Sequence, residues 1–372
     1  MNFSEFDLNP KIKSGIKACG YTKPTAIQDQ AIPHALRGQD IMGLAQTGTG
    51  KTAAFVLPIL ERLLQKKSKK PRALVLSPTR ELAEQTLEFF MLLGRHTGLR
   101  GVSVYGGVSK AGQVKKIRAG VDIITACPGR LLDLLRDRAV DLSRIESLVL
   151  DESDRMLDMG FMPDIKSIIQ QLPAERQNML FSATMPADIL ILADQILRKP
   201  VRVEVNHKKA LQNITQSLYP VERRPKSEML LSLLKQKCSG ATLVFTKTRH
   251  MATKLAKRLS QAGIRARELQ GNMSQNNRDR VMKDFQKGSF KVLVATDIAS
   301  RGIDVASISH VINYDMPDTV ESYTHRIGRT GRAAGSGEAS TFVEPKDYRL
   351  IRAIERGQEQ RLNRKFLKVA SI

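Results

Sequence analysis

A glycine-rich run near the N-terminus has the residue types and spacing of a phosphate-binding loop. It occupies residues 45–52, after the apolar stretch 40–44 and before a helical run over 53–64. Glycines let backbone N–H groups close around phosphate oxygens, and the following helix points its positive end at them. Lys51 would neutralise the β- and γ-phosphates, and the Thr52 hydroxyl would bind Mg²⁺. The candidate residues are Ala45, Gln46, Thr47, Gly48, Thr49, Gly50, Lys51 and Thr52.

One departure from the motif and one alternative explanation apply to this loop. Ala45 stands where a strict phosphate loop has Gly, and a tight strand-to-helix turn would have a similar composition.

An acidic quartet supplies the complementary chemistry. Asp151-Glu152-Ser153-Asp154 follows the apolar run 147–150. Carboxylates at the end of a buried strand are costly unless they serve a cation or a reaction. Asp151 would hold Mg²⁺ through water, and Glu152 would deprotonate the attacking water in phosphoryl transfer. The alternative is an acidic cap on a helix. Lys51, Asp151 and Glu152 are therefore the catalytic candidates here, with Thr52 and Asp151 as the metal ligands.

Ser182-Ala183-Thr184 ends the next apolar run. In an open parallel sheet, ligands bind beyond the carboxyl ends of the strands, so the three motifs are expected to meet in one crevice. Hydroxyls of Ser182 and Thr184 would bond Asp154 and report the nucleotide state. A plain Ser/Thr helix cap explains the string equally well.

The elements that would position these residues form two series. Strands are expected at 73–77, 121–125, 147–150 and 179–182, and again at 242–246, 291–295 and 310–314. Helices are expected between them at 80–93, 129–136, 250–262 and 276–287. Apolar strands alternating with helices indicate parallel sheets covered on both faces. We expect an α/β lobe over 1–204, a polar linker over 205–214, a second lobe over 215–345 and a basic helix with a tail over 346–372.

The net charge points to a polyanionic partner. The 372 residues hold 60 Lys and Arg against 37 Asp and Glu, a formal charge of +23. Such an excess favours nucleic acid through counterion release, although a basic proteome or solubility would give the same count. It does not separate RNA from DNA. The absence of Trp makes an aromatic stacking platform an unlikely binding mode.

The remaining composition indicates a cytoplasmic protein. Cys19, Cys127 and Cys238 are scattered, which argues against a disulfide framework or a zinc site. No apolar run approaches the roughly 18 residues of a membrane span, and the N-terminus lacks the pattern of a secretory signal.

The ordered strings resemble the DEAD-box family of superfamily 2 RNA helicases over roughly residues 3–345. Residues 20–28 look like the family's Q motif, and Phe3 lies 17 residues upstream of Gly20, at its aromatic position. The resemblance implies two tandem RecA-like lobes joined by a short flexible linker, with ATP and Mg²⁺ as cofactors. It also implies that Gln28 reads the adenine edge and that Phe3 stacks on the ring. Without the family, Phe3 would be interpreted as a core residue. The ATP-binding residues that it adds are Phe3, Tyr21, Thr25, Gln28 and Asp304, the last on the ribose.

Further strings look like the family's RNA-contacting motifs, although each alone is a common loop. The resemblance assigns RNA contacts in the first lobe to Pro78, Thr79, Arg80, Gly106, Gly107, Pro128, Gly129 and Arg130. In the second lobe it assigns them to Thr246, Arg249, Gln275, Arg278, Thr296 and Asp297.

The string over residues 325–332 is similar to the family's arginine-finger motif. The resemblance makes Arg329 and Arg332 the fingers, which would stabilise transition-state charge on the γ-phosphate. It gives His325 and Arg326 the task of coupling nucleotide to RNA, as it does Asp154, Ser182 and Thr184. The alternative is a basic loop that binds RNA phosphates directly.

Three features depart from the family pattern. Ser153 replaces the Ala of the acidic box, and we expect the chemistry to survive. Cys127 replaces Thr, which weakens one expected RNA contact. After residue 345 we expect no long accessory domain. The N-terminal string and the phosphate-loop context look most like compact bacterial members of the RhlE type.

The resemblance implies that ATP and RNA together close two loosely tethered lobes, so each ligand tightens the other. We therefore expect an RNA-stimulated ATPase that binds single-stranded RNA through sugar and phosphate and unwinds short duplexes locally or remodels RNP. We also expect it to be a monomer that does not bind membranes. Ribosomal or other RNP components remain candidate partners. The alternatives are an ATP-gated RNA clamp with little unwinding, a DNA translocase and a metabolic P-loop kinase. The basic end either adds RNA affinity or is a solvated helix face.

Overall fold

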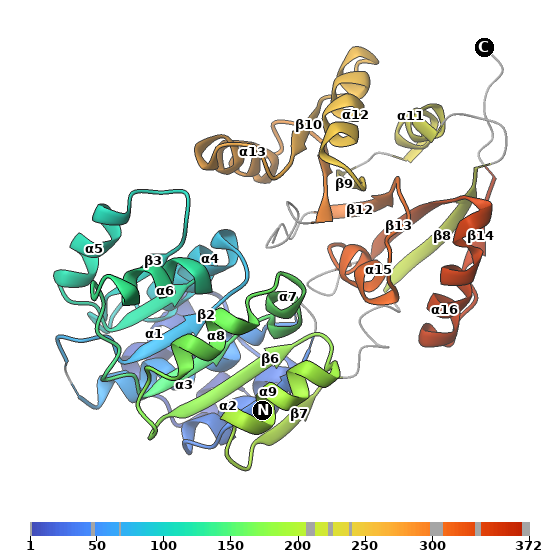
Figure 1. Ribbon diagram of the computed structural model, residues 1–372. Coiled ribbons are helices and arrows are strands. Elements are labelled where there is room, and N and C mark those ends of the chain that lie inside the picture. Colours follow the sequence, from blue (N-terminus) through green and yellow to red (C-terminus); the bar gives the residue numbers. More distant parts are fainter. Residues whose placement is uncertain are drawn as a thin grey trace. The chain divides into compact units, whose positions relative to one another are not determined.

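The computed structural model describes residues 2–45, 49–66, 68–205, 213–221, 226–237, 240–297, 308–331 and 336–366. The chain divides into two compact units, Met1–Val205 and Asn206–Ile372, called unit 1 and unit 2 below. Each unit is a parallel sheet with helices packed on it (Figure 1).

Unit 1 contains a seven-stranded sheet in the order β3-β4-β2-β5-β6-β1-β7 among its described residues. Its strands are β1 (Ile41–Leu44), β2 (Ala73–Leu76), β3 (Gly101–Val104), β4 (Ile123–Ala126), β5 (Ser147–Leu150), β6 (Gln177–Ser182) and β7 (Val201–Glu204). Its helices are a 3-10 turn η1 (Phe3–Glu5), α1 (Pro10–Ala18), α2 (Ala26–Leu36), α3 (Lys51–Leu64), α4 (Arg80–Leu93), α5 (Lys110–Arg118), α6 (Pro128–Arg136), α7 (Ser153–Asp158), α8 (Met162–Ile169) and α9 (Ala187–Ile196). The pairs β5–β6 and β1–β6 are parallel, so the carboxyl ends of β1, β5 and β6 lie side by side.

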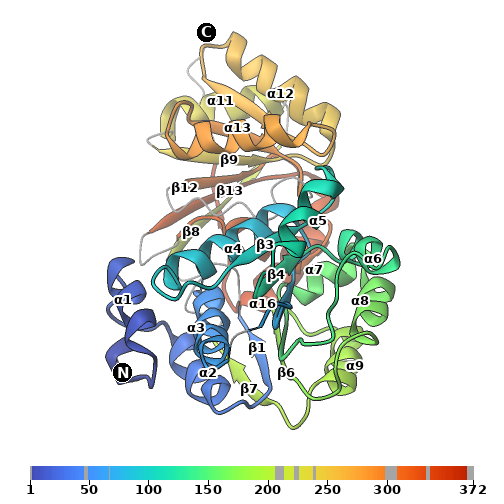
Figure 2. The same cartoon turned by 90° about the vertical axis from the view of Figure 1, so that its left-hand side faces the viewer.

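Alternate residues of the interior strands of unit 1 supply two separate cores. Ala73 and Val75 of β2 pack with helices α1 to α4, whereas Leu74 and Leu76 pack with α6 to α9. Figure 2 shows α1, α2 and α3 on one side of the strands and α6, α8 and α9 on the other. Strands buried on both faces favour apolar residues, which is why the interior strands of unit 1 consist largely of apolar residues.

Unit 2 contains a second seven-stranded sheet in the order β10-β11-β9-β12-β13-β8-β14 among its described residues, and its paired strands are parallel. Its strands are β8 (Ile214–Pro220), β9 (Ala241–Phe245), β10 (Ala266–Leu269), β11 (Val292–Ala295), β12 (Ile308–Asn313), β13 (Gly337–Val343) and β14 (Asn363–Arg364). Its helices are α11 (Lys226–Lys237), α12 (Arg249–Gln261), α13 (Gln275–Gln286), α15 (Val320–Ile327), a 3-10 turn η2 (Pro345–Asp347) and α16 (Tyr348–Gln358).

The expected fold class, two RecA-like parallel-sheet lobes, is confirmed. The strands foreseen from apolar runs are β2, β4, β5, β6, β9, β11 and β12, and α4 has the predicted bounds. Sequence reasoning did not predict β3, β7, β8, β10, β13 and β14, of which β3, β7, β10 and β14 lie at sheet edges.

Beyond residue 345 the chain forms the helix α16, which packs into unit 2. Ile351 and Ile354 of α16 are buried in a core with Tyr323 and Ile327 of α15. After α16 the chain adds β14 to the edge of the sheet beside β8. Ile214, expected at the end of the linker, begins β8, and residues 206–212 lie outside the described residues.

Candidate nucleotide site and nucleic-acid interface

The glycine-rich loop is bonded to the segment upstream of it. The Gln28 side-chain amide donates from Nε2 to the Gly50 carbonyl (3.0 Å), and its Oε1 accepts from the Thr25 N–H (2.9 Å). Gly50 has φ +92°, and a Cβ there would lie 2.5 Å from Gln28 Nε2, so only glycine fits. Each end of the Gln28 amide keeps one further hydrogen-bonding valence for a ligand.

Lys51 and Asp151 form a buried pair at the carboxyl edge of the sheet. Lys51 Nζ lies 3.9 Å from Asp151 Oδ1, and both side chains are about 95% buried. Neither atom has a hydrogen-bond partner among the described residues. Burial raises the pKa of Asp151 to about 6, although the Lys51 ammonium opposes the rise. Buried polar groups are nearly always bonded in native proteins, so this pair is built to receive a polar ligand.

The chemistry of this pair fits a nucleotide phosphate with Mg²⁺. An orphaned ammonium at the start of α3 suits phosphate oxygens, and an orphaned carboxylate oxygen suits a hard cation. Within the described part of the chain, no three or more His, Cys, Asp and Glu side chains gather into a metal site. Thr52 and Asp151 are the residues that would hold a metal ion here, and Mg²⁺ commonly takes its other ligands from phosphate and water.

Glu152 is held by an arginine that sequence reasoning did not single out. Glu152 sits at the N-cap of α7 in the left-handed region (φ 53°), and both it and Arg155 are buried. Arg155 Nη1 donates to Glu152 Oε2 at 2.8 Å. The spacing i, i+3 on one helix face was the available signal. The ion pair fixes the Glu152 carboxylate in a buried place.

Asp154 connects the acidic quartet to Ser182 and Thr184. Its backbone N–H donates to Ser182 Oγ (3.1 Å), and its Oδ2 accepts from the N–H (2.9 Å) and hydroxyl (3.0 Å) of Thr184. The structure thus brings these three expected coupling residues together at the ends of β5 and β6.

Ser153 finds acceptors that explain how it replaces alanine. Its hydroxyl lies 3.3 Å from the Leu150 carbonyl and 3.2 Å from the Phe181 carbonyl, inside the sheet. Through these bonds it touches neither the Asp151 nor the Glu152 carboxylate.

Ser153→Ala is expected to leave ATP turnover within about twofold and to change stability by about 1 kcal/mol or less, since one neutral hydrogen bond is lost. Steady-state turnover and urea unfolding measure both. A tenfold loss of turnover in a folded variant would show that the hydroxyl takes part in the chemistry.

Phe3 lies in the core of unit 1. Its ring stacks on Tyr21 (centroids 5.9 Å apart, 26° between planes) and meets Phe6 edge-on. This packing agrees with the interpretation of Phe3 as a core residue. It also places Tyr21 beside Phe3 in the N-terminal segment of the candidate nucleotide site. Stacking of Phe3 on adenine stays a prediction.

Three expected RNA-contacting strings of unit 1 converge on one loop. Gly107 has φ +82°, and a Cβ there would overlap the Arg80 guanidinium. Arg130 Nη1 donates to the Val108 carbonyl (3.2 Å) and to Gln113 Oε1 (3.3 Å). Two guanidinium groups and an open glycine backbone therefore border the same surface, which suits sugar–phosphate contacts.

The other residues of these strings start helices. Thr79 Oγ1 caps α4 by accepting from the Leu82 N–H (3.3 Å). Pro128 and Gly129 open α6, where Cys127 makes no side-chain cap bond. Burial raises the pKa of the Cys127 thiol to about 12, so it stays protonated and a poor hydrogen bonder.

Gly107→Ala is expected to weaken RNA binding about three- to tenfold, because the new Cβ displaces the Arg80 guanidinium. The backbone strain at this φ, about 1–2 kcal/mol, is present in both the free and the bound protein and lowers stability instead. RNA titration by fluorescence anisotropy measures it. Gly98→Ala is the matched control, since Gly98 has φ +76° but no atom within 4 Å of a new Cβ. Equal losses in both variants would make the effect one of backbone strain alone.

In unit 2 the expected RNA residues follow the carboxyl ends of neighbouring strands. Thr246 follows β9 and is buried, with its hydroxyl donating to the Thr248 carbonyl (3.3 Å). Arg249 begins α12 and donates to Asn272 Oδ1, and Arg278 Nη1 donates to the Gln270 carbonyl (3.4 Å). Thr296 and Asp297 follow β11, next to β9.

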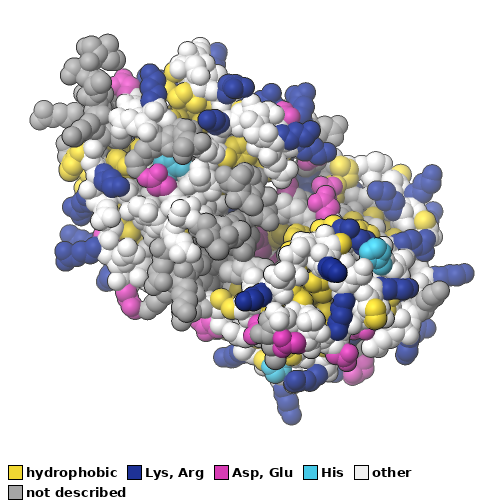
Figure 3. Space-filling model, turned by 180° about the vertical axis from the view of Figure 1, so that it is seen from behind, with side chains coloured by type: hydrophobic (Ala, Val, Ile, Leu, Met, Phe, Trp, Pro, Cys, Tyr) yellow, Lys and Arg dark blue, Asp and Glu magenta, His cyan; other side chains and the backbone are white. Residues whose placement is uncertain are grey.

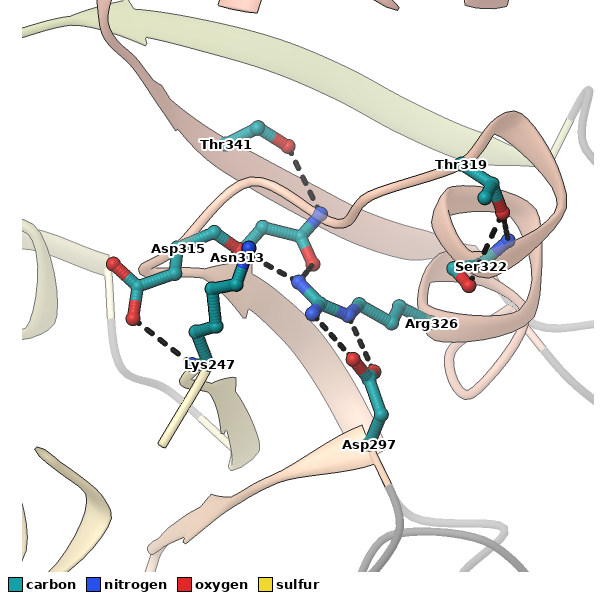
Figure 4. Close-up of polar contacts among 8 residues, drawn as sticks. All are labelled: Lys247, Asp297, Asn313, Asp315, Thr319, Ser322, Arg326 and Thr341. Atoms are coloured by element: carbon teal, nitrogen blue, oxygen red, sulfur yellow. Dashed lines mark hydrogen bonds and ion pairs between the residues drawn. The ribbon is translucent and has the colours of Figure 1, made fainter. Parts of the chain in front are cut away.

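Arg326 is a buried hub of this edge (Figure 4). Its guanidinium makes a bidentate pair with Asp297 (2.6 and 2.7 Å), and Nη1 donates to Asn313 Oδ1 (3.2 Å) and the Asp315 carbonyl (2.6 Å). It also lies over the Phe245 ring, 5.0 Å from the centroid. Arg326 is only 3% exposed, and its guanidinium donates to residues of unit 2. Any role of Arg326 in coupling nucleotide to RNA would therefore act through these partners.

Some expected site residues lie outside the described residues. They are Gln46, Thr47, Gly48, Asp304 and Arg332, together with the side chain of Gln275. His325 lies in the last turn of α15, and Arg329 follows that helix directly and is buried.

The surface carries the basic excess of the composition. Figure 3 shows Lys and Arg side chains spread widely over the visible face, with Asp and Glu less frequent. No helix within the described ranges is long and apolar enough to cross a membrane.

A parallel sheet with a glycine-rich loop after β1 and carboxylates after β5, followed by a second sheet of the same kind, is the architecture of a two-lobed P-loop nucleotide-binding protein. Family models sharpen this class: DEAD/DEAH box helicase matches residues 25–191, and Helicase conserved C-terminal domain matches residues 225–334.

Individual proteins agree with these matches. The chain is 42% identical over 373 residues to the DEAD-box ATP-dependent RNA helicase CshA of Streptococcus pneumoniae, covering 100% of the chain and 71% of the relative. It is 42% identical to RhpA of Helicobacter pylori, over 94% of the chain and 70% of that protein. Dbp5 of S. cerevisiae bound to RNA and ADP BeF3 superposes with a TM-score of 0.89 at 32% identity, over 98% of this chain and 96% of Dbp5. The chain therefore belongs to the DEAD-box ATP-dependent RNA helicase family.

Proposed function

We propose that the chain hydrolyses ATP with Mg²⁺ on unit 1 and uses the nucleotide to grip single-stranded RNA and open short RNA duplexes locally or remodel RNP. The observation that carries the proposal is the buried pair of Lys51 and Asp151, whose facing atoms have no hydrogen-bond partner among the described residues. Glu152, which follows Asp151 directly, supplies a base.

Each residue of unit 1 has a task that its surroundings support. Lys51 binds the β- and γ-phosphate oxygens, and Thr52 with Asp151 holds Mg²⁺, which when bound neutralises phosphate charge. Glu152, fixed by Arg155, orients the water and accepts its proton. Gln28 reads the adenine edge with the valences that Thr25 and Gly50 leave open.

Unit 2 is proposed to complete the chemistry with charge. Arg329 and Arg332 act as arginine fingers on the γ-phosphate, and Asp304 binds the ribose. On unit 1, Asp154 senses the nucleotide and passes its state to Ser182 and Thr184, which already bond to it. His325 and Arg326 belong to the same coupling.

RNA recognition is proposed to run through sugar and phosphate. Arg80, Gly107 and Arg130 border one surface of unit 1, and the loops after β9 and β11 border the corresponding edge of unit 2. Such contacts tolerate any sequence, and contacts to 2′-hydroxyls would select RNA over DNA. Dbp5, bound to RNA and ADP BeF3, and the relatives named as RNA helicases support this assignment.

One assay series tests the proposal. ATP turnover is measured without nucleic acid and with single-stranded RNA, duplex RNA and DNA, alongside strand separation of a short RNA duplex. We expect RNA, and not DNA, to raise turnover. Equal stimulation by DNA would favour a DNA translocase, and RNA-locked ATP binding without strand separation would favour a clamp. Turnover indifferent to RNA would refute the proposal.

Finer points belong to the same proposal. We place the protein in the cytoplasm as a monomer, with Mg²⁺ as its metal and RNP components among its partners. The basic character of residues 346–372 supports additional nonspecific RNA affinity. An unchanged salt dependence of RNA binding after the exposed Arg349, Arg352 and Arg361 are replaced by Gln would assign that affinity elsewhere.

A further inference from the structure

A lysine outside every assigned motif bridges two carboxylates in unit 2. Lys226 begins α11, and its Nζ lies 3.1 Å from Asp315 Oδ1 and 2.6 Å from Glu344 Oε1. It also lies over the Tyr314 ring, 5.7 Å from the centroid. The Lys226 side chain is only 17% exposed, so the two ion pairs are largely screened from water. Asp315 follows β12 and Glu344 follows β13, which are neighbours in the sheet.

The ionisation of this cluster is firmly set. Burial lowers the pKa of Lys226, but hydrogen bonds and charges from Glu344 and Asp315 more than offset it, so the pKa lies above its ordinary value. The hydrogen bonds from Lys226 and then Lys346 lower the pKa of Glu344 to about 2. Lys226 and Glu344 are therefore charged at neutral pH, and the Lys226 ammonium lies between the carboxylates of Asp315 and Glu344.

Asp315 connects this cluster to residues that follow β9 and, through Arg326, to Asp297 after β11 (Figure 4). Its Oδ2 accepts from the Lys247 N–H (2.9 Å). Lys247 directly follows Thr246 and lies just before α12. Its backbone carbonyl accepts from Arg326 Nη1 (2.6 Å), and Arg326 holds both carboxylate oxygens of Asp297. One aspartate thus fixes the backbone just after β9 and, through Arg326, the side chain of Asp297 just after β11.

We propose that Lys226 is a positioning residue for the RNA site of unit 2, because it fixes Asp315 and through it the loops that carry Thr246 and Asp297. Without the ammonium, Asp315 and Glu344 repel each other and Asp315 leaves the Lys247 N–H. Thr246 and Asp297 then lose their fixed positions, and RNA must order these two residues on binding. This inference rests on the proposed RNA contacts of those loops. It assigns no contact of Lys226 with RNA or nucleotide.

The decisive variant is Lys226→Met in the full chain. We expect the RNA concentration for half-maximal ATP turnover to rise about tenfold, as for loss of a charged hydrogen bond, with turnover at saturating RNA and the RNA-free KM for ATP within about twofold. Lys226→Arg can still bridge both carboxylates and is expected to restore the half-saturating concentration to within about threefold. Lys235→Met removes the same charge from an exposed position of the same helix and should shift it by less than about twofold.

The route through Asp315 has its own test. Asp315→Asn keeps an acceptor for the Lys247 N–H but loses the ion pair, so we expect a rise in the same direction. If Lys226 acts through Asp315, the double variant shifts no further than Lys226→Met alone, whereas independent effects would add. Asp315→Asn also carries the test alone if Lys226→Met does not fold.

Two other outcomes are decisive, one against this inference and one against the proposed function. A lower melting temperature and lower maximal turnover with an unchanged half-saturating RNA concentration would make Lys226 a residue of stability only. An unmodified chain that RNA fails to stimulate would instead refute the proposed function itself. Whether RNA stimulates ATP turnover of the unmodified protein distinguishes failure of the inference from failure of the proposed function.

Discussion

Glu152→Gln is expected to reduce RNA-stimulated ATP turnover by about 10²–10⁴-fold, the usual contribution of a positioned general base. Gln has the same shape and still offers an oxygen to Arg155 Nη1, which now donates to Glu152 Oε2 at 2.8 Å. The left-handed turn at residue 152 and the start of α7 should persist, so the loss falls on proton transfer. Steady-state turnover at saturating ATP and RNA measures it.

RNA binding is the internal control for this variant. In the presence of ATP, Glu152→Gln should bind single-stranded RNA at least as tightly as the unmodified chain, because the ATP-bound state no longer decays. Ser153→Ala, in the next residue, controls for disturbance of the turn. Turnover of Glu152→Gln within tenfold of the unmodified protein would remove Glu152 from the role of base.

The central strands were predictable because a physical rule leaves a clear trace in the sequence. Strands β2, β4, β5, β9 and β11 are covered on both faces, so nearly every residue must be apolar. Edge strands escape the rule. In β10, Arg267 is exposed, so no continuous apolar run marks the strand.

Strand β13 was missed for a different reason. It is interior but polar in sequence, and its Ser340 and Thr341 are buried because they bond His310 and Asn313 of β12 (2.9 and 3.1 Å). Only knowledge of the neighbouring strand makes those residues acceptable in a core.

The convergence of the nucleotide motifs followed from topology. Parallel strands place their carboxyl ends at one edge, so loops after β1, β5 and β6 had to meet once the sheet was parallel. The contact of Asp154 with Thr184 was foreseen on this basis and is present at 2.9 and 3.0 Å.

The supporting partners could not be foreseen in the same way. Arg155, Lys226 and Asn313 act through the reach and direction of their side chains, which depend on rotamers and packing rather than on strand order. Arg326 shows the limit most clearly. Likeness gives it a coupling role, but only the structure shows that its donors are used by Asp297, Asn313 and Asp315.

Arg329→Ala is expected to produce the largest loss, about 10³–10⁵-fold in RNA-stimulated turnover, which is the range attributed to arginine fingers. The reason is electrostatic: in the proposed role, the Arg329 guanidinium would stabilise charge on the γ-phosphate that develops only in the transition state. ATP binding in the ground state should therefore change much less than turnover. Nucleotide titration and steady-state turnover on the same preparation measure the two quantities separately.

The interpretation of that loss depends on keeping the fold, since Arg329 is buried directly after α15. Arg329→Lys keeps the charge but not the planar fork, so it should fall between the unmodified chain and Arg329→Ala. Arg352→Ala, on the exposed face of α16, should leave maximal turnover unchanged. If Arg329→Ala melts at the temperature of the unmodified chain and still turns over more than a tenth as fast, hydrolysis does not need this arginine of unit 2. The first unit would then carry the chemistry without it, and RNA stimulation would need another source.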